Sequence, residues 1–191
     1  MLILLIALFQ FAELASNASS DAAPPCTRER IIWQDGLKIG IGDFVGPLGN
    51  PRHSAEANTG IATSSRAGGN PATFIVEAET FFDPCKSWFR PDEPDAQNTL
   101  EHERIHFDIS EVYARKLMAR YATEIKNYAQ FARTHDRLYN EVWRDSRRTQ
   151  DQYDTEVYAD RERQTYWADW VADQLEATTP WAKKRLELPM R

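Results

Sequence analysis

The sequence predicts an α+β fold, in which an antiparallel, β-rich N-terminal part is followed by about three helices. Between residues 29 and 90, short apolar segments are separated by turns rich in Gly, Pro and Asn, as strands joined by loops are. From Asp95 onward, apolar side chains recur at three- and four-residue spacing, which is typical of one face of a helix. The 191 residues are 42% hydrophobic and 27% charged, so we expect one domain with a buried core, over residues 30–177.

The first residues indicate export. Residues 1–11 are almost wholly apolar and small residues follow, so we predict a signal peptide over about residues 1–18 and a flexible lead-in over 19–29. Spanning a membrane takes about 20 apolar residues, so we expect no stable membrane anchor. A buried N-terminal helix is the alternative, because no Lys or Arg precedes the apolar run. Export predicts a periplasmic or secreted protein.

The chain has two cysteines, Cys26 and Cys85. Because exported proteins fold in an oxidising compartment, we predict that these two form one disulfide. The loop that it closes is long, and the chain-entropy model gives a stabilisation of about 4 kcal/mol. The disulfide would hold the start of the mature chain next to the segment that precedes the first helix.

Four segments of the N-terminal part have strand character: residues 30–33, 37–41, 60–64 and Thr73–Phe82. The last of them is the clearest, because apolar side chains fall on one of its faces and glutamates on the other. Residues 46–58 contain Gly, Pro and Asn and are expected to form a loop.

The first predicted helix begins at Asn98, whose side chain can cap it together with Glu101 three residues later. Ile105 and Ile109 continue an apolar stripe with helical spacing, so the helix is expected to run to about Arg120.

Two further helices are expected over about residues 124–148 and 153–177, with the boundary anywhere from 144 to 152. Pro180 ends the last helical pattern, and residues 178–191 are expected to be a loose tail.

The first helix carries the motif His-Glu-x-x-His, formed by His102, Glu103 and His106. Residues four apart lie one turn apart on the same helix face, so both imidazoles can bind one ion. Glu103 lies about 100° around the helix from His102, where a carboxylate can take a proton from a metal-bound water. Imidazole ligands and an open fourth position suit Zn²⁺, which we expect as the cofactor. The alternative is a polar helix face that carries two histidines by chance.

A catalytic zinc site needs at least one more protein ligand. Glu156 and Asp160 have the four-residue spacing of a known design, in which a Glu binds zinc and an Asp orients the first His through a hydrogen bond. We therefore expect Glu156 as the third metal ligand and Asp160 as the residue that supports His102. His135 and Asp154 are alternative third ligands, and so is Asp160 itself.

Three segments around the motif resemble a bacterial family named domain of unknown function 922: residues 87–91, 100–109 and 111–117. Less specific similarity covers most of the mature chain, from about residue 31 to residue 175. The family is described as predicted secreted or periplasmic zinc-dependent proteases. The resemblance therefore implies an exported bacterial protein with a zincin-like metallopeptidase architecture.

The chain departs from the family pattern in two places. Arg104 and Ile105 stand where the family usually has Gln-Gly, and neither position has to bind metal. After Glu156, the chain lacks the Thr-x-His-Gly segment that continues the family's C-terminal motif. If the family's third ligand is the His of that segment, the site of this chain is either completed by a carboxylate or degenerate.

Together these observations predict an exported zinc-dependent peptidase, with Glu103 as the general base. Its partner would be a protein or peptide substrate, to which the strand Thr73–Phe82 offers an edge. The net charge of −6 argues against a nucleic-acid partner. The alternative is a non-catalytic exported binding or structural module, whose His-Glu-x-x-His site is vestigial or only holds zinc.

Overall fold

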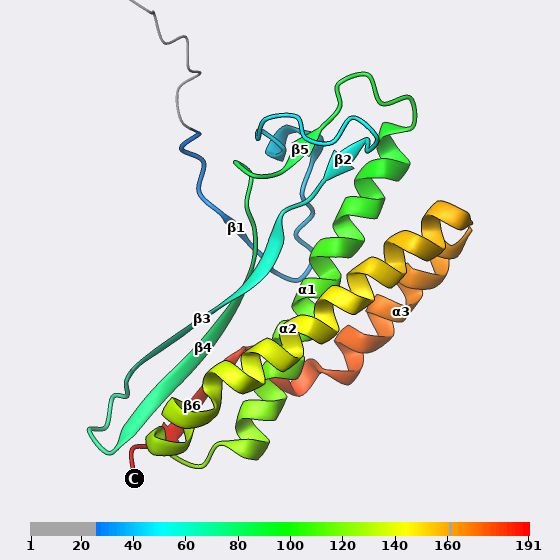
Figure 1. Ribbon diagram of the computed structural model, residues 1–191. Coiled ribbons are helices and arrows are strands. Elements are labelled where there is room, and N and C mark those ends of the chain that lie inside the picture. Colours follow the sequence, from blue (N-terminus) through cyan, green and yellow to red (C-terminus); the bar gives the residue numbers. More distant parts are fainter. Residues whose placement is uncertain (1–25, 161) are drawn as a thin grey trace, which may run out of the picture.

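The computed structural model describes residues 26–160 and 162–191 (Figure 1). The predicted signal peptide and most of the predicted lead-in lie outside these residues. The described chain is α+β, with antiparallel strands followed by three helices, as the sequence predicts. Among the described helices, none is long and apolar enough to cross a membrane.

The larger sheet is built around its central strand, β4 (Thr73–Phe82). β3 (Thr59–Ala67) pairs with one edge of β4 as an antiparallel hairpin. The other edge of β4 is shared by β1 (Ile31–Ile32) near one end and β6 (Arg185–Pro189) near the other. Both edges of β4 are therefore occupied, so the expectation that this strand offers an edge to a substrate is wrong. Among the described strands, β3, β1 and β6 each pair with β4 alone, so each has an outer edge without a partner strand.

The predicted strand over residues 37–41 is not a strand. Ile39 is buried in a loop, and its carbonyl oxygen accepts a hydrogen bond from Arg104 Nε at 2.8 Å. The apolar residues two positions to either side are exposed. The alternating apolar pattern of residues 37–41 therefore arises from a loop in which Ile39 alone is buried against the core. A short 3-10 helix, η1 (Ile41–Asp43), follows this loop.

A second, two-stranded sheet pairs β2 (Ala55–Glu56) with β5 (Trp88–Phe89). β2 lies inside the stretch of residues 46–58 that the sequence predicts as a loop, since two residues are too few to show alternation. This small sheet holds the segment before β3 against α1, where Ala57 N–H reaches Glu103.

The first helix, α1, spans Ala96–Glu124 and is longer than predicted. Asn98 does not cap it, because the N-cap position is Asp95 and Asn98 lies inside the first turn. Glu101 accepts hydrogen bonds from the side chains of Gln97 and Arg104 within the same helix.

The second helix, α2 (Tyr128–Ala159), is continuous, and α3 (Arg163–Ala177) follows a break that begins at Asp160. The predicted break between residues 144 and 152 is therefore wrong. The sequence has no Gly or Pro between residues 124 and 179, so it contains no local signal for the position of the break. As a consequence, residues 150–158 share the orientation of α2.

The predicted loose tail is also wrong. The chain after α3 forms a short 3-10 helix, η2 (Thr179–Trp181), and then β6, whose residues 185–189 pair with residues 73–77 of β4. Leu186 and Leu188 pack against the main core, whereas Arg185, Glu187 and Pro189 are exposed. The folded unit therefore extends beyond residue 177.

The helices pack together beside the sheet, with α1 in contact with β3, β4, α2 and α3 (Figure 1). The main core joins the inner face of the sheet to α1 and α2. Its buried members include Phe74, Val76, Ala78, Ala114, Leu117, Met118, Tyr121, Phe131, Leu138 and Val142. Because α1 is surrounded on several sides, it is a rigid base for the side chains that it carries.

A buried cluster of charged side chains joins α1 to the last part of the chain. Glu111 is fully buried, and its carboxylate accepts hydrogen bonds from Arg115 Nε at 2.8 Å and Lys184 Nζ at 2.6 Å. Thr80 Oγ1 on β4 donates a third, at 2.7 Å. Both cations also lie over the ring of Trp33. We refer to Glu111, Arg115, Lys184 and Thr80 as the closed cluster.

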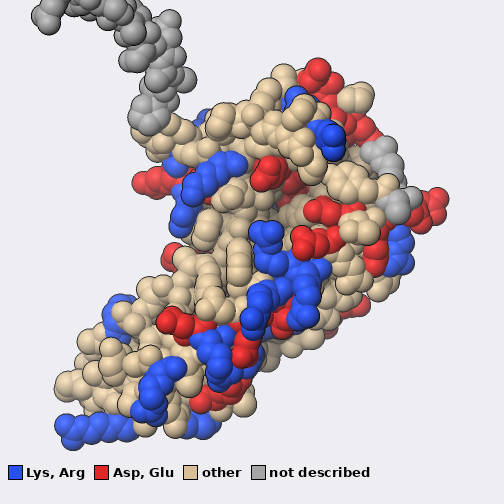
Figure 2. Space-filling model, in the orientation of Figure 1, with Lys and Arg blue, Asp and Glu red and all other residues tan. Residues whose placement is uncertain are grey.

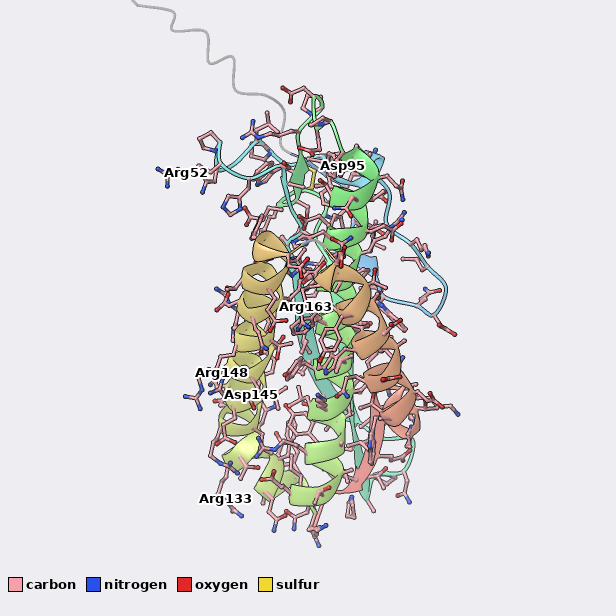
Figure 3. The ribbon with its side chains drawn as sticks, turned by 90° about the vertical axis from the view of Figure 1, so that its right-hand side faces the viewer. Arg52, Asp95, Arg133, Asp145, Arg148 and Arg163 are labelled. Carbon is pink, nitrogen blue, oxygen red and sulfur yellow. A yellow bond between two sulfur atoms is a disulfide. The ribbon has the colours of Figure 1, made fainter. Side chains whose placement is uncertain are left out.

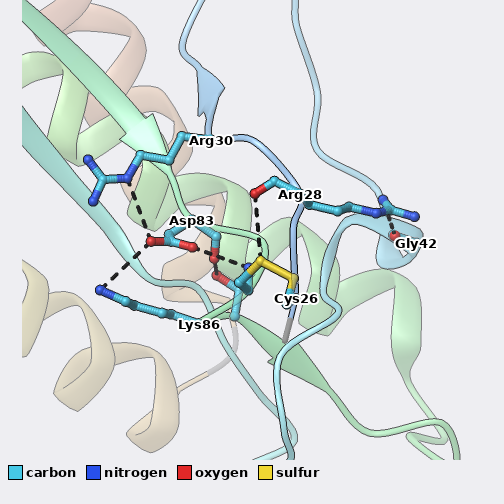
Figure 4. Close-up of a disulfide and its surroundings, with 8 residues drawn as sticks. Cys26, Arg28, Arg30, Gly42, Asp83 and Lys86 are labelled. Atoms are coloured by element: carbon cyan, nitrogen blue, oxygen red, sulfur yellow. Dashed lines mark hydrogen bonds and ion pairs between the residues drawn. A yellow bond between two sulfur atoms is a disulfide. The ribbon is translucent and has the colours of Figure 1, made fainter. Parts of the chain in front are cut away.

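The predicted disulfide between Cys26 and Cys85 is confirmed, with 5.6 Å between the two Cα atoms (Figure 4). Beside it, the carboxylate of Asp83 lies between Arg30 and Lys86, at 3.6 Å and 3.8 Å (Figure 4). The disulfide ties the first described residues to the segment that leads into β5.

Candidate metal centre

Three side chains from two helices converge on one point. His102 and His106 project from the same face of α1, and Asp154 projects toward them from α2. Asp154 Oδ1 lies 3.0 Å from His102 Nε2 and 2.9 Å from His106 Nε2, and the two nitrogens are 3.0 Å apart. Within the described residues, these three form the group whose atoms could hold a metal ion.

The donor set fits Zn²⁺. A tetrahedral zinc with bonds of about 2.0–2.1 Å holds neighbouring donor atoms about 3.3 Å apart, so the triangle has nearly the required size. Two imidazoles and one carboxylate are ligands that zinc accepts in catalytic sites, where they leave a fourth position open. The same donors also suit other divalent transition metals, so the geometry indicates a candidate metal site without identifying the metal.

Gln150 fixes the orientation of His106. Its side-chain oxygen contacts His106 Nδ1, and its amide nitrogen donates to the His106 carbonyl at 3.0 Å and to Ser110 Oγ at 3.2 Å. With Nδ1–H donated to Gln150, the neutral ring presents the lone pair of Nε2 to the triangle. This supporting contact was not predicted, and it depends on the register between α1 and α2.

His102 is held by stacking. Its ring lies on the ring of Tyr153, with centroids 4.6 Å apart and 22° between the planes. Tyr153 is fully buried, and its hydroxyl donates to the His102 carbonyl at 3.3 Å. Tyr153 therefore positions the ring of His102, and the next residue along α2, Asp154, contacts that ring.

Glu103 lies beside the triangle and is 5% exposed. Its Oε2 accepts a hydrogen bond from Ala57 N–H at 2.7 Å, which orients the carboxylate. Burial raises the pKa of Glu103, and the two imidazoles and the Ala57 hydrogen bond oppose that rise. A buried carboxylate with a raised pKa is suited to accept a proton near neutral pH.

In the absence of metal, the triangle holds a proton. Burial disfavours the charged form of His106, but the hydrogen bond to Asp154 and the charge of Glu103 outweigh it and raise the pKa to about 9. Burial likewise disfavours ionised Asp154, yet hydrogen bonds from both imidazoles hold the pKa of Asp154 well below its usual range. A metal ion at this point would replace that proton.

The metal site opens into a cleft with two chambers. One, of about 240 Å³, extends toward Trp143 and Arg147 on α2, and the other, of about 250 Å³, extends toward Asn98 and Gln164. Both are lined by His53, Ala55, His102, Glu103 and Tyr158. Figure 2 shows a hollow between the N-terminal β-rich part and α2, with acidic side chains at its border. The cleft therefore continues on both sides of Glu103.

The structure brings Asp154, not Glu156, to the two imidazoles, which corrects the expected third ligand. Residues two apart on a helix point about 200° away from each other, so only one of the pair can face α1. Glu156 instead accepts hydrogen bonds from Arg163 and from Trp167 Nε1, the latter at 3.0 Å. Figure 3 shows Arg163 between α2 and α3, where it meets this carboxylate.

The other expected site residues lie elsewhere. Asp160 is the C-cap of α2, and its side chain accepts a hydrogen bond from Glu162 N–H at 3.0 Å instead of supporting His102. His135 is hydrogen-bonded to Tyr121 at 2.6 Å, near the other end of α2. His53, from the loop before β2, reaches the cleft, and its ring lies 6.3 Å from that of Tyr158.

The fold and the site together define an α+β protein with a candidate metal centre of two histidines and one aspartate, next to a buried glutamate. Comparison of the chain with protein-family models, curated proteins and solved structures finds no match. The resemblance to the family named above therefore stays a prediction from the sequence.

Proposed function

We propose that the protein is an exported zinc-dependent peptidase. The observation that carries the proposal is the triangle of His102, His106 and Asp154, in a cleft that also contains the buried carboxylate of Glu103. The disulfide between Cys26 and Cys85 supports export, because such bonds persist mainly in oxidising compartments.

His102, His106 and Asp154 would hold the ion, with Gln150 and Tyr153 fixing the two rings. Zinc at this position supplies a Lewis acid that polarises a carbonyl group and lowers the pKa of water toward about 7. Glu103 would take the proton of the attacking water on a carboxylate oxygen and deliver it to the leaving amine. The hydrogen bond from Ala57 keeps this carboxylate in place during both transfers.

A peptide substrate is supported by the shape of the cleft and by β3. The chambers on both sides of Glu103 give room for a chain that continues in both directions from the bond to be cut. Thr59, at the start of β3, lines the chamber of about 240 Å³ next to the metal triangle, and β3 pairs with β4 along one edge only among the described strands. An extended peptide can add to the other edge of such a strand through main-chain hydrogen bonds.

The test measures bound zinc and peptide hydrolysis in matched variants. We expect one zinc per chain in the parent and in Glu156→Gln, and loss of zinc in Asp154→Asn and His102→Ala. Glu103→Gln should retain zinc and lose hydrolysis by about 10²–10⁴-fold, because only the proton transfer is removed.

Each outcome has a consequence for the proposal. Zinc lost in Glu156→Gln and kept in Asp154→Asn would show that the arrangement of α2 is different from the one described. Hydrolysis retained in Glu103→Gln would refute the role of the general base. Zinc bound by the parent without hydrolysis of any peptide would leave a protein that only holds zinc.

A further inference from the structure

The wall of the cleft formed by α2 carries an exposed cation that is not neutralised. α2 contains Arg133, Arg137, Arg144, Arg147 and Arg148, and Figure 2 shows a band of basic side chains along this helix up to the hollow. Arg137 pairs with Glu124 and Glu141, and Arg148 pairs with Asp145. Arg147 makes no ion pair with any described residue, and it lines the chamber next to the metal triangle.

The position of Arg147 on the helix directs it toward the metal site. It precedes Asp154 by seven residues, which is two turns, so the two side chains leave the helix within about 20° of each other. Asp151, which also lines the chamber, is three residues from Asp154 and is rotated by about 60°. Arg147 therefore lies on the cleft side of the basic band, whereas Arg133 and Arg148 point away from the body of the molecule in Figure 3.

Four carboxylates line the chamber with Arg147: Glu56, Glu103, Asp151 and Asp154. Asp151, one turn from Arg147, forms no ion pair with it among the described residues, and the other three are already engaged within the protein. Asp154 is shared by the two imidazoles, and Glu103 accepts the hydrogen bond from Ala57. Glu56 accepts a hydrogen bond from Trp88 Nε1 at 3.1 Å. An uncompensated guanidinium in a cleft is a good receptor for a carboxylate, because its planar N–H groups can bind both oxygens at once.

From this arrangement we infer that Arg147 binds a carboxylate of the substrate, so that the protein prefers peptides with an acidic group on one side of the bond that is cut. This inference rests on the proposed peptidase function. Seven residues of helix span about 10 Å, and an extended peptide advances about 3.3 Å per residue. The carboxylate should therefore belong to the second or third residue from the cleaved bond, as a side chain or as the end of the peptide.

Binding is measured with Glu103→Gln loaded with zinc, so that peptides are not consumed. Three labelled peptides of equal length are compared by fluorescence anisotropy. The first has an internal Asp or Glu and an amidated end, the second has no acidic side chain and a free C-terminal carboxylate, and the third is neutral and amidated. The same peptides are titrated into the double variants that add Arg147→Glu, Arg147→Ala or Arg133→Glu.

We expect the first peptide to bind about tenfold more tightly than the neutral one, as a charge-assisted bidentate hydrogen bond would give. The advantage should persist with Arg133→Glu, which makes the same change of charge outside the cleft. It should vanish with Arg147→Ala and invert with Arg147→Glu. If only the second peptide binds more tightly than the neutral one, Arg147 binds the C-terminal carboxylate of the peptide and not an acidic side chain.

Two results would overturn the inference. One is an acidic preference that survives Arg147→Glu in a variant with normal zinc content, and the other is equal binding, or no binding, of all three peptides. The outcomes for the two proposals are separable. Hydrolysis by the parent without charge preference would refute only the role of Arg147, and binding that depends on Arg147 without hydrolysis would refute only the peptidase function.

Discussion

Helix α1 contributes to two groups of charged side chains, and they differ in how their polar atoms are arranged. In the closed cluster, the carboxylate of Glu111 meets two cations and a hydroxyl and has no exposure to solvent. In the metal triangle, one oxygen of Asp154 faces two imidazole nitrogens, and the Asp154 side chain is 40% exposed. The first arrangement is complete without a ligand, whereas the second is an arrangement of donor atoms around a point that a cation can occupy.

The comparison shows how to distinguish a structural from a functional set of charges. Both sets are formed by residues far apart in the sequence, and both involve hydrogen bonds shorter than 3.1 Å. The two sets differ in the atoms that meet. In the triangle, three atoms that can each donate a lone pair to a metal surround one point, whereas in the closed cluster a carboxylate meets N–H and O–H groups. We therefore expect the closed cluster to govern stability and the triangle to govern metal binding, and the following predictions test this division.

The largest effect on stability should come from Glu111→Gln. The change leaves Arg115 and Lys184 buried without a counter-charge, which typically costs about 3–5 kcal/mol of unfolding free energy. The measurement is urea denaturation of the zinc-loaded chain. Glu187→Gln, which removes an exposed carboxylate on β6, is the control and should change stability by less than about 0.5 kcal/mol. A loss below about 1 kcal/mol in Glu111→Gln would contradict the role assigned to the cluster.

The metal-free chain should lose stability at high pH. The pKa of His106 is raised to about 9 in the folded chain, against 6.5 for an unperturbed histidine, so its stabilising contribution is complete below pH 6.5. The contribution, about 3 kcal/mol at most, is lost as the pH rises through about 9. Denaturation at a series of pH values in the presence of a chelator measures it, and Asp154→Asn should flatten the curve. A stability that rises over this range would contradict the proton-bound triangle.

Zinc should stabilise the folded chain and remove that pH dependence. At a free concentration one hundred times the dissociation constant, a ligand of the native state adds about 2.7 kcal/mol to the unfolding free energy. Thermal unfolding with and without a chelator measures the difference. A chelator should not change the unfolding temperature of His102→Ala, which is expected to bind no zinc. Zinc should raise the unfolding temperature of Glu111→Gln by as much as it raises that of the parent. A zinc effect of equal size in His102→Ala would place the ion elsewhere.

The smallest effect should come from Gln150→Leu, which removes the hydrogen bond to His106 and leaves the three ligands in place. Loss of such a supporting contact lowers metal affinity by about 10–100-fold. Competition with a coloured zinc chelator measures the affinity. Gln152→Leu is the matched control, because Gln152 lies on the same helix, is exposed and donates its side-chain hydrogen bond to Glu156, away from the metal triangle. Equal affinity in the two variants would show that Gln150 does not orient the ring.

The sequence predicted the parts of the site that one helix contains. His102, Glu103 and His106 are fixed relative to one another by helix geometry, so their spacing alone places two rings together and a carboxylate beside them. The choice between Asp154 and Glu156 depends on the rotation of α2 about its axis, which packing against α1 determines. Because the predicted break fell before residue 153, both residues were assigned to the wrong helix, and the favoured ligand was wrong.

The two long strands and β1 overlap predicted strands, and the other short strands were missed. β3 and β4 have enough residues to show alternation, whereas β2 and β5 have only two residues each. β6 was missed although Leu186 and Leu188 alternate with Arg185 and Glu187, a signal that could have been recognised. Its partner strand is formed by residues 73–77, and no local feature of the sequence indicates a pairing over such a distance.

β6 also has a consequence for the order in which the protein is made. Thr73 and Glu187, which are hydrogen-bonded, are separated by 114 residues, so β4 is synthesised long before its partner. Until Lys184 arrives, Glu111 has Arg115 but not its second cation, and the edge of β4 at residues 73–77 stays unpaired. An unpaired strand edge is a point at which chains aggregate. During biosynthesis, the early hairpin and α1 therefore depend on a segment that is made much later, and a chain interrupted before residue 184 would carry the three candidate metal ligands on an unfinished sheet.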